Sequence, residues 1–411
     1  MYRETCKKKL GNSKLDPRLI SKEFVFYSAD LRFFRELHFQ KSIQLGEIPI
    51  LIDPSALDYW QNKFQVNIHR IDDSNLPDRK DKEDSIQKLS NLGNFQCGFA
   101  SSGSTGEAKV FLKSQSELLS EINFLKQFVK PWAIQSMINS VPLCHIYGFL
   151  WSYALPLELG ISITDASSLS QLRKELYKST ANLLVSVPSI LQSLIGLISV
   201  DKAMHIKTII SSGSRLKTEL AQDLERNWEA KIFEIYGSTE TGGMAYRIPS
   251  QEEGLHFFPE IETKLIEQSL CVKSPFINKD LLHDDGYFYT NDIGEIKDGL
   301  FFYQGRKDRI VKVNGKRVHL DSLEQEISAL LSGTDILVTE FNSLDDINQI
   351  GLLISKDFEN NEEMQIQNIQ SKLSTLPKYF QPNKFKIVNR LPTLPNGKKD
   401  YQLAKNEFHT S

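Results

Sequence analysis

The stretch that decides the fold is FASSGSTGEAKVFLKS, Phe99 to Ser114, in which a Gly- and Ser-rich segment separates two apolar runs. Glycines in such a segment allow backbone conformations closed to other residues, so several N–H groups can point at one anion. The Walker A pattern has Lys directly after its last Gly, but Glu107 and Ala108 precede Lys109 here, which disfavours a P-loop NTPase. The stretch predicts a phosphate-binding loop at a strand end, with a plain polar loop as the alternative.

Strands and helices alternate after this loop. Residues 109–113 predict a strand, and Ser114 with Glu117 predicts a capping box that begins a helix. Further strands are expected at 183–187, 207–212 and 231–237, separated by helical patterns such as RLKTELAQDLERNW. This alternation predicts an α/β fold with a parallel sheet, which binds ligands at the carboxyl ends of its strands.

The length of 411 residues exceeds the usual size of one hydrophobic core. After Arg309 the pattern changes to a helix near 321–331, strands at 336–341 and 350–355, and a helix near 362–373. We therefore expect a large N-terminal α/β domain at 1–307 and a small α+β C-terminal domain at 308–411.

Composition limits the function class. A formal net charge of -3 gives no reason to expect nucleic acid or an anionic membrane as the main partner. The four cysteines lack C-x-x-C spacing, so neither a zinc site nor a disulfide framework is indicated. No apolar stretch follows the basic N-terminus, so we expect a soluble cytoplasmic protein without a signal peptide or membrane span.

A second candidate segment is IYGSTETGG, 235–243. The ring of Tyr236 could stack on a base, the hydroxyl of Thr239 could donate to a phosphate, and the carboxylate of Glu240 could ligate Mg²⁺. Taken alone, an ordinary β-to-α turn is the simpler interpretation.

Three later segments carry further candidates. In DGYFYTNDIGEI, 285–296, Asp292 is expected in a turn where it could accept from ribose hydroxyls. In YQGRKDRIVKVNGKRV, 303–318, Arg306 and Lys312 could meet phosphate or ribose. LPTLPNGKKD, 391–400, presents Lys398 in a loop. Each of these also has a plain interpretation as a turn aspartate or a solvated cation.

The five segments in this order resemble the adenylate-forming superfamily of acyl-CoA synthetases, adenylation domains and luciferases. The resemblance runs from about Gly46 to Lys399. It implies a ligase with a large N-terminal domain and a small rotating C-terminal domain. A carboxylate would attack the α-phosphate of ATP, giving acyl-adenylate and pyrophosphate, and a thiol of CoA or phosphopantetheine would then attack the acyl carbon.

The resemblance also implies roles for residues. Lys398, Thr239, Glu240 and His145 would be catalytic, with Glu240 on Mg²⁺ and Lys398 acting only in the first step. Asp308 would be a hinge whose rotation replaces the Lys398 loop with the segment Lys312 to Gly315, which lines the thiol's tunnel. The expected nucleotide-binding set is Ser101, Ser102, Gly103, Ser104, Thr105, Gly106, Lys109, Gly213, Ser214, Tyr236, Gly237, Asp292 and Arg306.

The acyl pocket is expected around His145, Tyr147 and Gly213. Adenylation domains for α-amino acids place an Asp at the position of His145 to pair with the substrate ammonium. The segment HIYG instead resembles ligases for aromatic acids, so we expect an aryl or acyl acid without an α-amino group. The alternative is that the aromatic residues at 147, 149, 151 and 153 belong to the core.

Some positions depart from the family pattern. Asn291 stands at a Gly position, and Ser212 stands where the first Gly of a GGA motif is common. Only 100 residues precede Ser101, so we expect a reduced N-terminal subdomain.

The acceptor is the least explicit feature. Eight Lys or Arg residues and one acidic residue, Asp400, lie between Lys372 and Lys405. This basic run favours an acyl carrier protein, with CoA as the second choice and a solvated face as the plain interpretation. An amine acceptor and a non-catalytic homologue that only binds nucleotide or carrier protein remain alternatives.

Overall fold

The computed structural model describes residues 24–29, 34, 38–54, 57–64, 68–69, 87–101, 109–166, 168–195, 205–313, 316–331, 334–342, 348–356, 362–378, 380–393 and 399–408. The chain divides into two compact units. The first comprises residues up to 262, apart from 104–107, together with 272–288, and the second contains 263–271 and 289–411. The expected hinge at Asp308 lies inside the second unit and stays a prediction.

The first unit begins with a five-stranded sheet in the order β3-β1-β2-β4-β5. Its strands are β1 (Phe24–Ser28), β2 (Ile48–Ile52), β3 (Ile68–His69), β4 (Gln96–Ser101) and β5 (Lys109–Ser114). Helices α3 (His38–Gln44) and α4 (Leu57–Phe64) belong to this part of the chain. β4 and β5 pair antiparallel, so the predicted phosphate-binding segment connects two adjacent strands.

The second sheet of the first unit has the strand order β12-β11-β10-β9-β8-β6-β7. Its strands are β6 (Ser136–Asn139), β7 (Ser162–Asp165), β8 (Leu183–Ser186), β9 (Thr208–Ser211), β10 (Lys231–Ser238), β11 (Gly242–Arg247) and β12 (Leu255–Phe257). Strands β6 to β10 pair in parallel. These pairings confirm the parallel sheet expected from the sequence. Strands such as β8 and β9 are apolar and buried along their whole length, as in parallel sheets that are covered on both faces.

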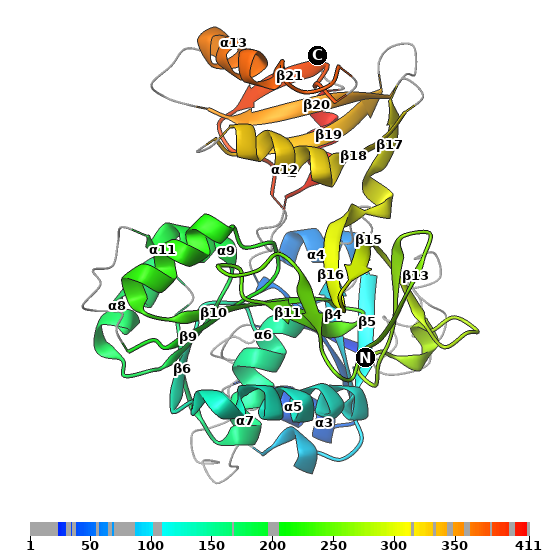
Figure 1. Ribbon diagram of the computed structural model, residues 1–411. Coiled ribbons are helices and arrows are strands. Elements are labelled where there is room, and N and C mark those ends of the chain that lie inside the picture. Colours follow the sequence, from blue (N-terminus) through cyan, green and yellow to red (C-terminus); the bar gives the residue numbers. More distant parts are fainter. Residues whose placement is uncertain are drawn as a thin grey trace. The chain divides into compact units, whose positions relative to one another are not determined.

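Helices flank this sheet, and Figure 1 shows three of them grouped along β6, β9 and β10. These are α8 (Leu169–Lys178), α9 (Pro188–Leu194) and α11 (Thr218–Trp228). Helix α5 (Gln115–Val129) begins at the predicted capping box, in which Ser114 and Glu117 each accept from the other's backbone N–H. The remaining helical segments of the first unit are η5 (Leu89–Asn91), η6 (Lys130–Trp132), α6 (Ile146–Phe149), a π turn η7 (Leu150–Ala154), α7 (Leu155–Leu159) and η8 (Lys279–Leu281).

Strands β13 (Glu262–Ile266), β14 (Ser269–Lys273), β15 (Phe288–Lys297) and β16 (Leu300–Arg306) neighbour one another in that order. They lead to the short turn η9 (Lys307–Arg309) and the hairpin of β17 (Ile310–Val313) and β18 (Lys316–His319). The rest of the second unit contains α12 (Leu320–Leu330), β19 (Ile336–Asn342), β20 (Asn348–Ser355), α13 (Glu362–Leu373), β21 (Lys384–Val388) and α14 (Tyr401–Asn406). A buried core that includes Leu323, Val338 and Leu352 supports this α+β arrangement.

Cys97, Cys144 and Cys271 are buried thiols. Among the described residues, no helix is both long enough and apolar enough to cross a bilayer.

Candidate functional site

The predicted phosphate-binding segment is described only at its two ends. Ser101 and Lys109 are paired in the antiparallel register of β4 and β5, and the Lys109 side chain is exposed. The set of Ser102, Gly103, Ser104, Thr105 and Gly106 lies outside the described residues. The register brings the two ends of the segment opposite each other.

The segment with Thr239 and Glu240 forms the tip of a hairpin between β10 and β11, not a β-to-α turn. The side chains of Ser238 and Thr241 close it, because each hydroxyl accepts from the other residue's backbone N–H at 3.1–3.2 Å. A Cβ on Gly237 would lie 2.2 Å from the carbonyl oxygen of Gly242, so only glycine fits at 237. The tight closure leaves Thr239 and Glu240 half-buried at the tip.

Two buried charged residues contact the main chain of this hairpin. The ammonium of Lys113 donates to the carbonyl of Glu240, and the carboxylate of Glu121 accepts from the N–H of Gly243. Burial raises the pKa of Glu121 to about 7, although Lys113 and the Gly243 N–H oppose this rise. Burial likewise lowers the pKa of Lys113, against the attraction of Glu121. Sequence reasoning missed both residues, and the only signal was a charge at 113 inside an apolar strand.

Three predicted residues lie at the carboxyl ends of adjacent parallel strands. In the parallel register, the end of β9 lies beside the end of β8 on one side and beside β10 on the other. Gly213 follows β9 with a φ of +90°, which favours glycine. The hydroxyl of Tyr147 donates to the carbonyls of Ser186 and Ile210 at 3.0 and 2.9 Å, which fixes its ring at this edge. Tyr236, near the end of β10, is half-buried.

Ser212 and Ser214 flank Gly213. The Ser212 hydroxyl donates to the carbonyl of Ile235 at 2.8 Å, so the residue that replaces a common glycine ties the end of β9 to β10. Ser214 is exposed. The serine at 212 therefore has a structural contact of its own at the edge of the sheet.

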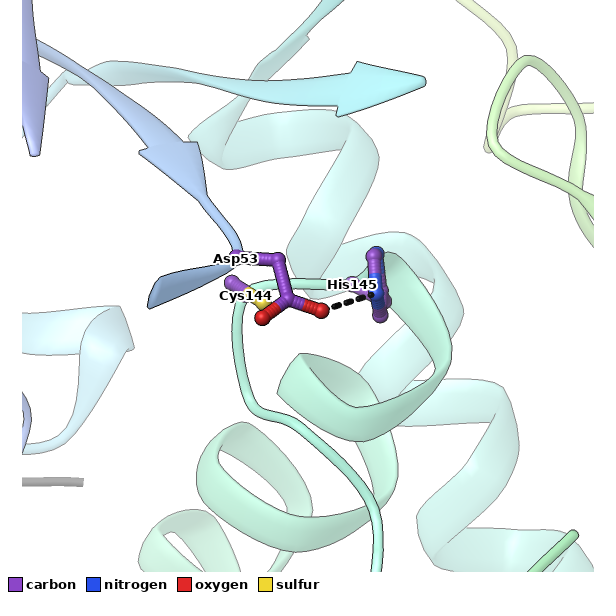
Figure 2. Close-up of side chains that lie close together, drawn as sticks. All are labelled: Asp53, Cys144 and His145. Atoms are coloured by element: carbon purple, nitrogen blue, oxygen red, sulfur yellow. Dashed lines mark ion pairs between the residues drawn. The ribbon is translucent and has the colours of Figure 1, made fainter. Parts of the chain in front are cut away.

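His145 lies beside a carboxylate that the sequence did not indicate. Its Nε2 is 3.4 Å from Oδ2 of Asp53, which follows β2, and Figure 2 shows the Cys144 sulfur next to the same carboxylate. Asp53 is buried and His145 is half-buried at the start of α6. The three donor atoms lie within 4.8 Å of one another. Burial raises the pKa of the Cys144 thiol well above its ordinary value, and Asp53 raises it further, so Cys144 stays a neutral thiol.

The other aromatic residues near His145 belong to the core. Phe149, Trp151 and Tyr153 are buried, and Phe149 packs edge-to-face on Phe39 and Phe99. This distribution supports the core interpretation for these three residues. It leaves His145 and Tyr147 as the partly exposed members of the segment.

Asp292 and Arg306 are brought together, but Asp292 lies in strand β15 rather than in the expected turn. The two residues face each other in the antiparallel pair of β15 and β16, with 3.4 Å between a guanidinium nitrogen and the carboxylate. Arg306 also makes two 3.0 Å hydrogen bonds to the carboxylate of Asp308 in η9. Asp292 lies in a strand because the antiparallel pairing of residues 288–297 with 300–306 includes it.

Lys312 is exposed on β17, whereas Gly315 and Lys398 lie outside the described residues. The chain on both sides of Lys398 is described. Thr393 and Lys399 form a β-bridge, and the Lys399 ammonium donates to the Glu324 carboxylate and to the carbonyl of Ile336, each at 2.7 Å. The two ends of the segment that carries Lys398 therefore lie beside each other, and the contacts of Lys399 hold them in place.

Comparisons with known proteins identify relatives of this chain. Residues 82–273 match the family described as AMP-binding enzyme. The D-alanine–D-alanyl carrier protein ligase of Staphylococcus epidermidis is 25% identical over 331 residues, which are 73% of this chain and 68% of that protein. The 4-coumarate–CoA ligase of Cereibacter sphaeroides is 28% identical over 223 residues, which are 54% of this chain and 50% of that protein.

Solved structures share the fold. ATP-bound MatB from Rhodopseudomonas palustris matches with a TM-score of 0.77 at 16% identity, covering 94% of this chain and 89% of that one. The o-succinylbenzoate CoA synthetase of Bacillus subtilis, in complex with its acyl-adenylate intermediate, matches with a TM-score of 0.74 at 15% identity over 94% and 89% of the two chains. The fold class expected from the sequence is confirmed.

Proposed function

We propose that the protein uses ATP to activate a carboxylic acid and then transfers the acyl group to a pantetheine thiol, because residues 82–273 match the family described as AMP-binding enzyme. One observation carries the proposal. Gly213 follows β9, and Tyr236, Thr239 and Glu240 follow the parallel part of the adjacent β10, so these four predicted residues share one sheet edge. Ligands bind at this edge in open α/β sheets.

In the first step, the substrate carboxylate would attack the α-phosphorus, the new P–O bond would give acyl-adenylate, and pyrophosphate would leave. The Thr239 hydroxyl would donate to an α-phosphate oxygen, and Lys398 would stabilise the charge that develops there. Glu240 offers the carboxylate oxygen that Mg²⁺ prefers, and Mg²⁺ would offset phosphate charge. Asp292 would accept from the ribose, held in place by Arg306.

In the second step, the thiol sulfur would attack the acyl carbon and AMP would leave. The exposed Lys312 on β17 would line the approach of the thiol after rotation at Asp308. ATP as a cytoplasmic substrate supports the cytoplasm as the location of the reaction.

Pyrophosphate exchange tests the proposal. The protein would be incubated with ATP, Mg²⁺, labelled pyrophosphate and one acid at a time from a panel of aryl acids, fatty acids and amino acids. We expect acid-dependent exchange into ATP. If no acid in the panel supports exchange, the result would instead favour a non-catalytic homologue. Exchange followed by amide formation without any thioester would favour an amine acceptor.

Asp53 bears on the class of acid. The expectation of a substrate without an α-amino group rested on the absence of a carboxylate at position 145, yet Asp53 supplies one 3.4 Å from His145. This observation favours an amino acid as a second candidate substrate. We retain the aryl or acyl acid, because His145 lies 3.4 Å from that carboxylate and Asp53 is only 7% exposed.

Asp53→Asn is expected to raise KM for an aryl or acyl acid roughly tenfold, since His145 loses the carboxylate that lies 3.4 Å from its Nε2. KM for ATP should stay unchanged. Exchange kinetics with both substrates provide the measurement, and Asp58→Asn, which removes an exposed carboxylate on α4, is the matched control. Loss of exchange with amino acids alone would establish the second candidate instead.

The basic run near the C-terminus is partly neutralised. Lys386, Lys399 and Lys405 pair with Glu407, Glu324 and Glu340, whereas Lys372, Lys378, Lys384 and Arg390 are exposed. The exposed members are therefore the candidates for docking an acidic carrier protein, which we propose as the acceptor ahead of CoA.

Reversal of two of the exposed charges, Lys384→Glu with Arg390→Glu, is expected to slow acyl transfer to a carrier protein roughly tenfold at low salt and to flatten its salt dependence. Pyrophosphate exchange should not change. Transfer rates measured across a salt series provide the test, with Lys174→Glu and Lys178→Glu on α8 as the control pair. If free CoA is acylated and no carrier protein is, the choice of a carrier protein as acceptor is wrong.

A further inference from the structure

A lysine and a glutamate are buried beneath the hairpin of β10 and β11. Lys113 of β5 is 1% exposed and Glu121 of α5 is 3% exposed. Removing an ammonium and a carboxylate from water is costly, and packing alone would favour apolar residues at both positions. The contacts of the two side chains therefore indicate what they hold in place.

Lys113 joins three distant segments of the first unit. Its Nζ donates to the carbonyl oxygen of Glu240 at 2.8 Å and to that of Phe276 at 2.7 Å. Glu240 is at the hairpin tip, and Phe276 lies in the loop after β14 with no exposed surface. One ammonium thus fixes the hairpin tip to β5 and to a buried loop.

Glu121 holds the other side of the tip. Its Oε1 accepts from the N–H of Gly243 at 2.7 Å. A Cβ on Gly242, whose φ is +70°, would lie 2.2 Å from Oε2 of the same carboxylate. The Gly–Gly pair that ends the STETGG segment is therefore needed for the approach of Glu121 as well as for the turn.

Both contacts are made to the main chain. The Glu240 carbonyl and the Gly243 N–H lie on opposite sides of Thr241, and neither contact uses the Glu240 carboxylate or the Thr239 hydroxyl. The arrangement fixes the backbone of the tip while leaving the side chains available for a ligand.

We propose that Lys113 and Glu121 are positioning residues that hold the 239–243 backbone so that Thr239 and Glu240 meet the phosphates and Mg²⁺ of ATP. This inference rests on the proposed function. It assigns to the buried pair a role in nucleotide binding that neither residue could perform by direct contact.

The test is a set of variants: Lys113→Met, Glu121→Leu, the double variant, and Glu121→Gln. Lys113→Met and Glu121→Leu each remove one hold on the tip. The double variant removes both charges together and so avoids leaving one charge buried alone, which keeps the test informative if a single variant does not fold. Glu121→Gln retains an oxygen that accepts from Gly243 and should restore near-normal behaviour. Lys130→Met, at an exposed lysine, is the control.

We expect the double variant to raise the Mg²⁺ concentration for half-maximal exchange and KM for ATP, each roughly tenfold. A role confined to folding would lower the amount of active enzyme and the melting temperature but leave both concentrations unchanged, and that result would overturn the proposal. A Glu121→Gln variant as impaired as Glu121→Leu would also contradict it.

Calorimetric titration of each variant with ATP and Mg²⁺ separates this inference from the proposed function. If the wild type binds ATP with Mg²⁺ but no acid supports pyrophosphate exchange, the ligase assignment fails. Weaker binding by the double variant would then still support the positioning role of Lys113 and Glu121. Equal binding by the wild type and the double variant would refute that role. Absence of binding by the wild type would refute both proposals.

Discussion

Lys398→Ala should lower acyl-adenylate formation by about two powers of ten or more, because an ammonium at the α-phosphate stabilises charge that exists only in the transition state. Thioester formation from supplied acyl-adenylate should be largely retained, since the lysine would belong to one of the two orientations of the C-terminal part. Pyrophosphate exchange measures the first half-reaction, and thioester release from synthetic acyl-adenylate measures the second.

The anchors beside Lys398 make this variant specific. Lys399 keeps its contacts with Glu324 and Ile336, and the bridge between Thr393 and Lys399 is made by the main chain, so the ends of the segment should be unaffected. Lys297→Ala, at an exposed lysine of the same unit outside the basic run, is the control for general loss of positive charge. A loss of equal size in both half-reactions would remove Lys398 from its assigned role.

Asp308→Pro should lower thioester formation by roughly tenfold or more while pyrophosphate exchange changes little. Proline fixes φ near about -65°, a value typical of the 3₁₀ turn in which Asp308 lies, so it should retain that turn and prevent rotation there. The same two half-reaction assays provide the measurement.

The structure adds a control that separates the backbone effect from the side-chain effect. The Asp308 carboxylate makes two hydrogen bonds to Arg306, which also contacts Asp292, so any substitution at 308 disturbs the ribose-binding candidates. Asp308→Ala removes those hydrogen bonds without fixing φ. If the alanine and proline variants lose thioester formation equally, Asp308 acts through Arg306 and is not a hinge.

The sequence by itself determined the elements whose signals are local. The strands near 183–187, 207–212 and 231–237 and the helix after Ser114 lie close to their expected bounds. Buried parallel strands read as continuous apolar runs, and a capping box is a contact within four residues, so neither depends on distant parts of the chain. The order of the Gly-, Ser- and Lys-containing segments was likewise enough to indicate an adenylate-forming enzyme.

Only the tertiary structure decided which distant residues meet. Asp53 lies beside His145, and the ammonium of Lys113 donates a hydrogen bond to the Glu240 carbonyl, although both pairs are far apart in sequence. The chain after Ser238 turns back as a strand, and Asp292 lies opposite Arg306 within a strand pair. Such contacts depend on strand order, register and the burial of charge against a specific partner, and none of these leaves a periodic pattern in a single sequence.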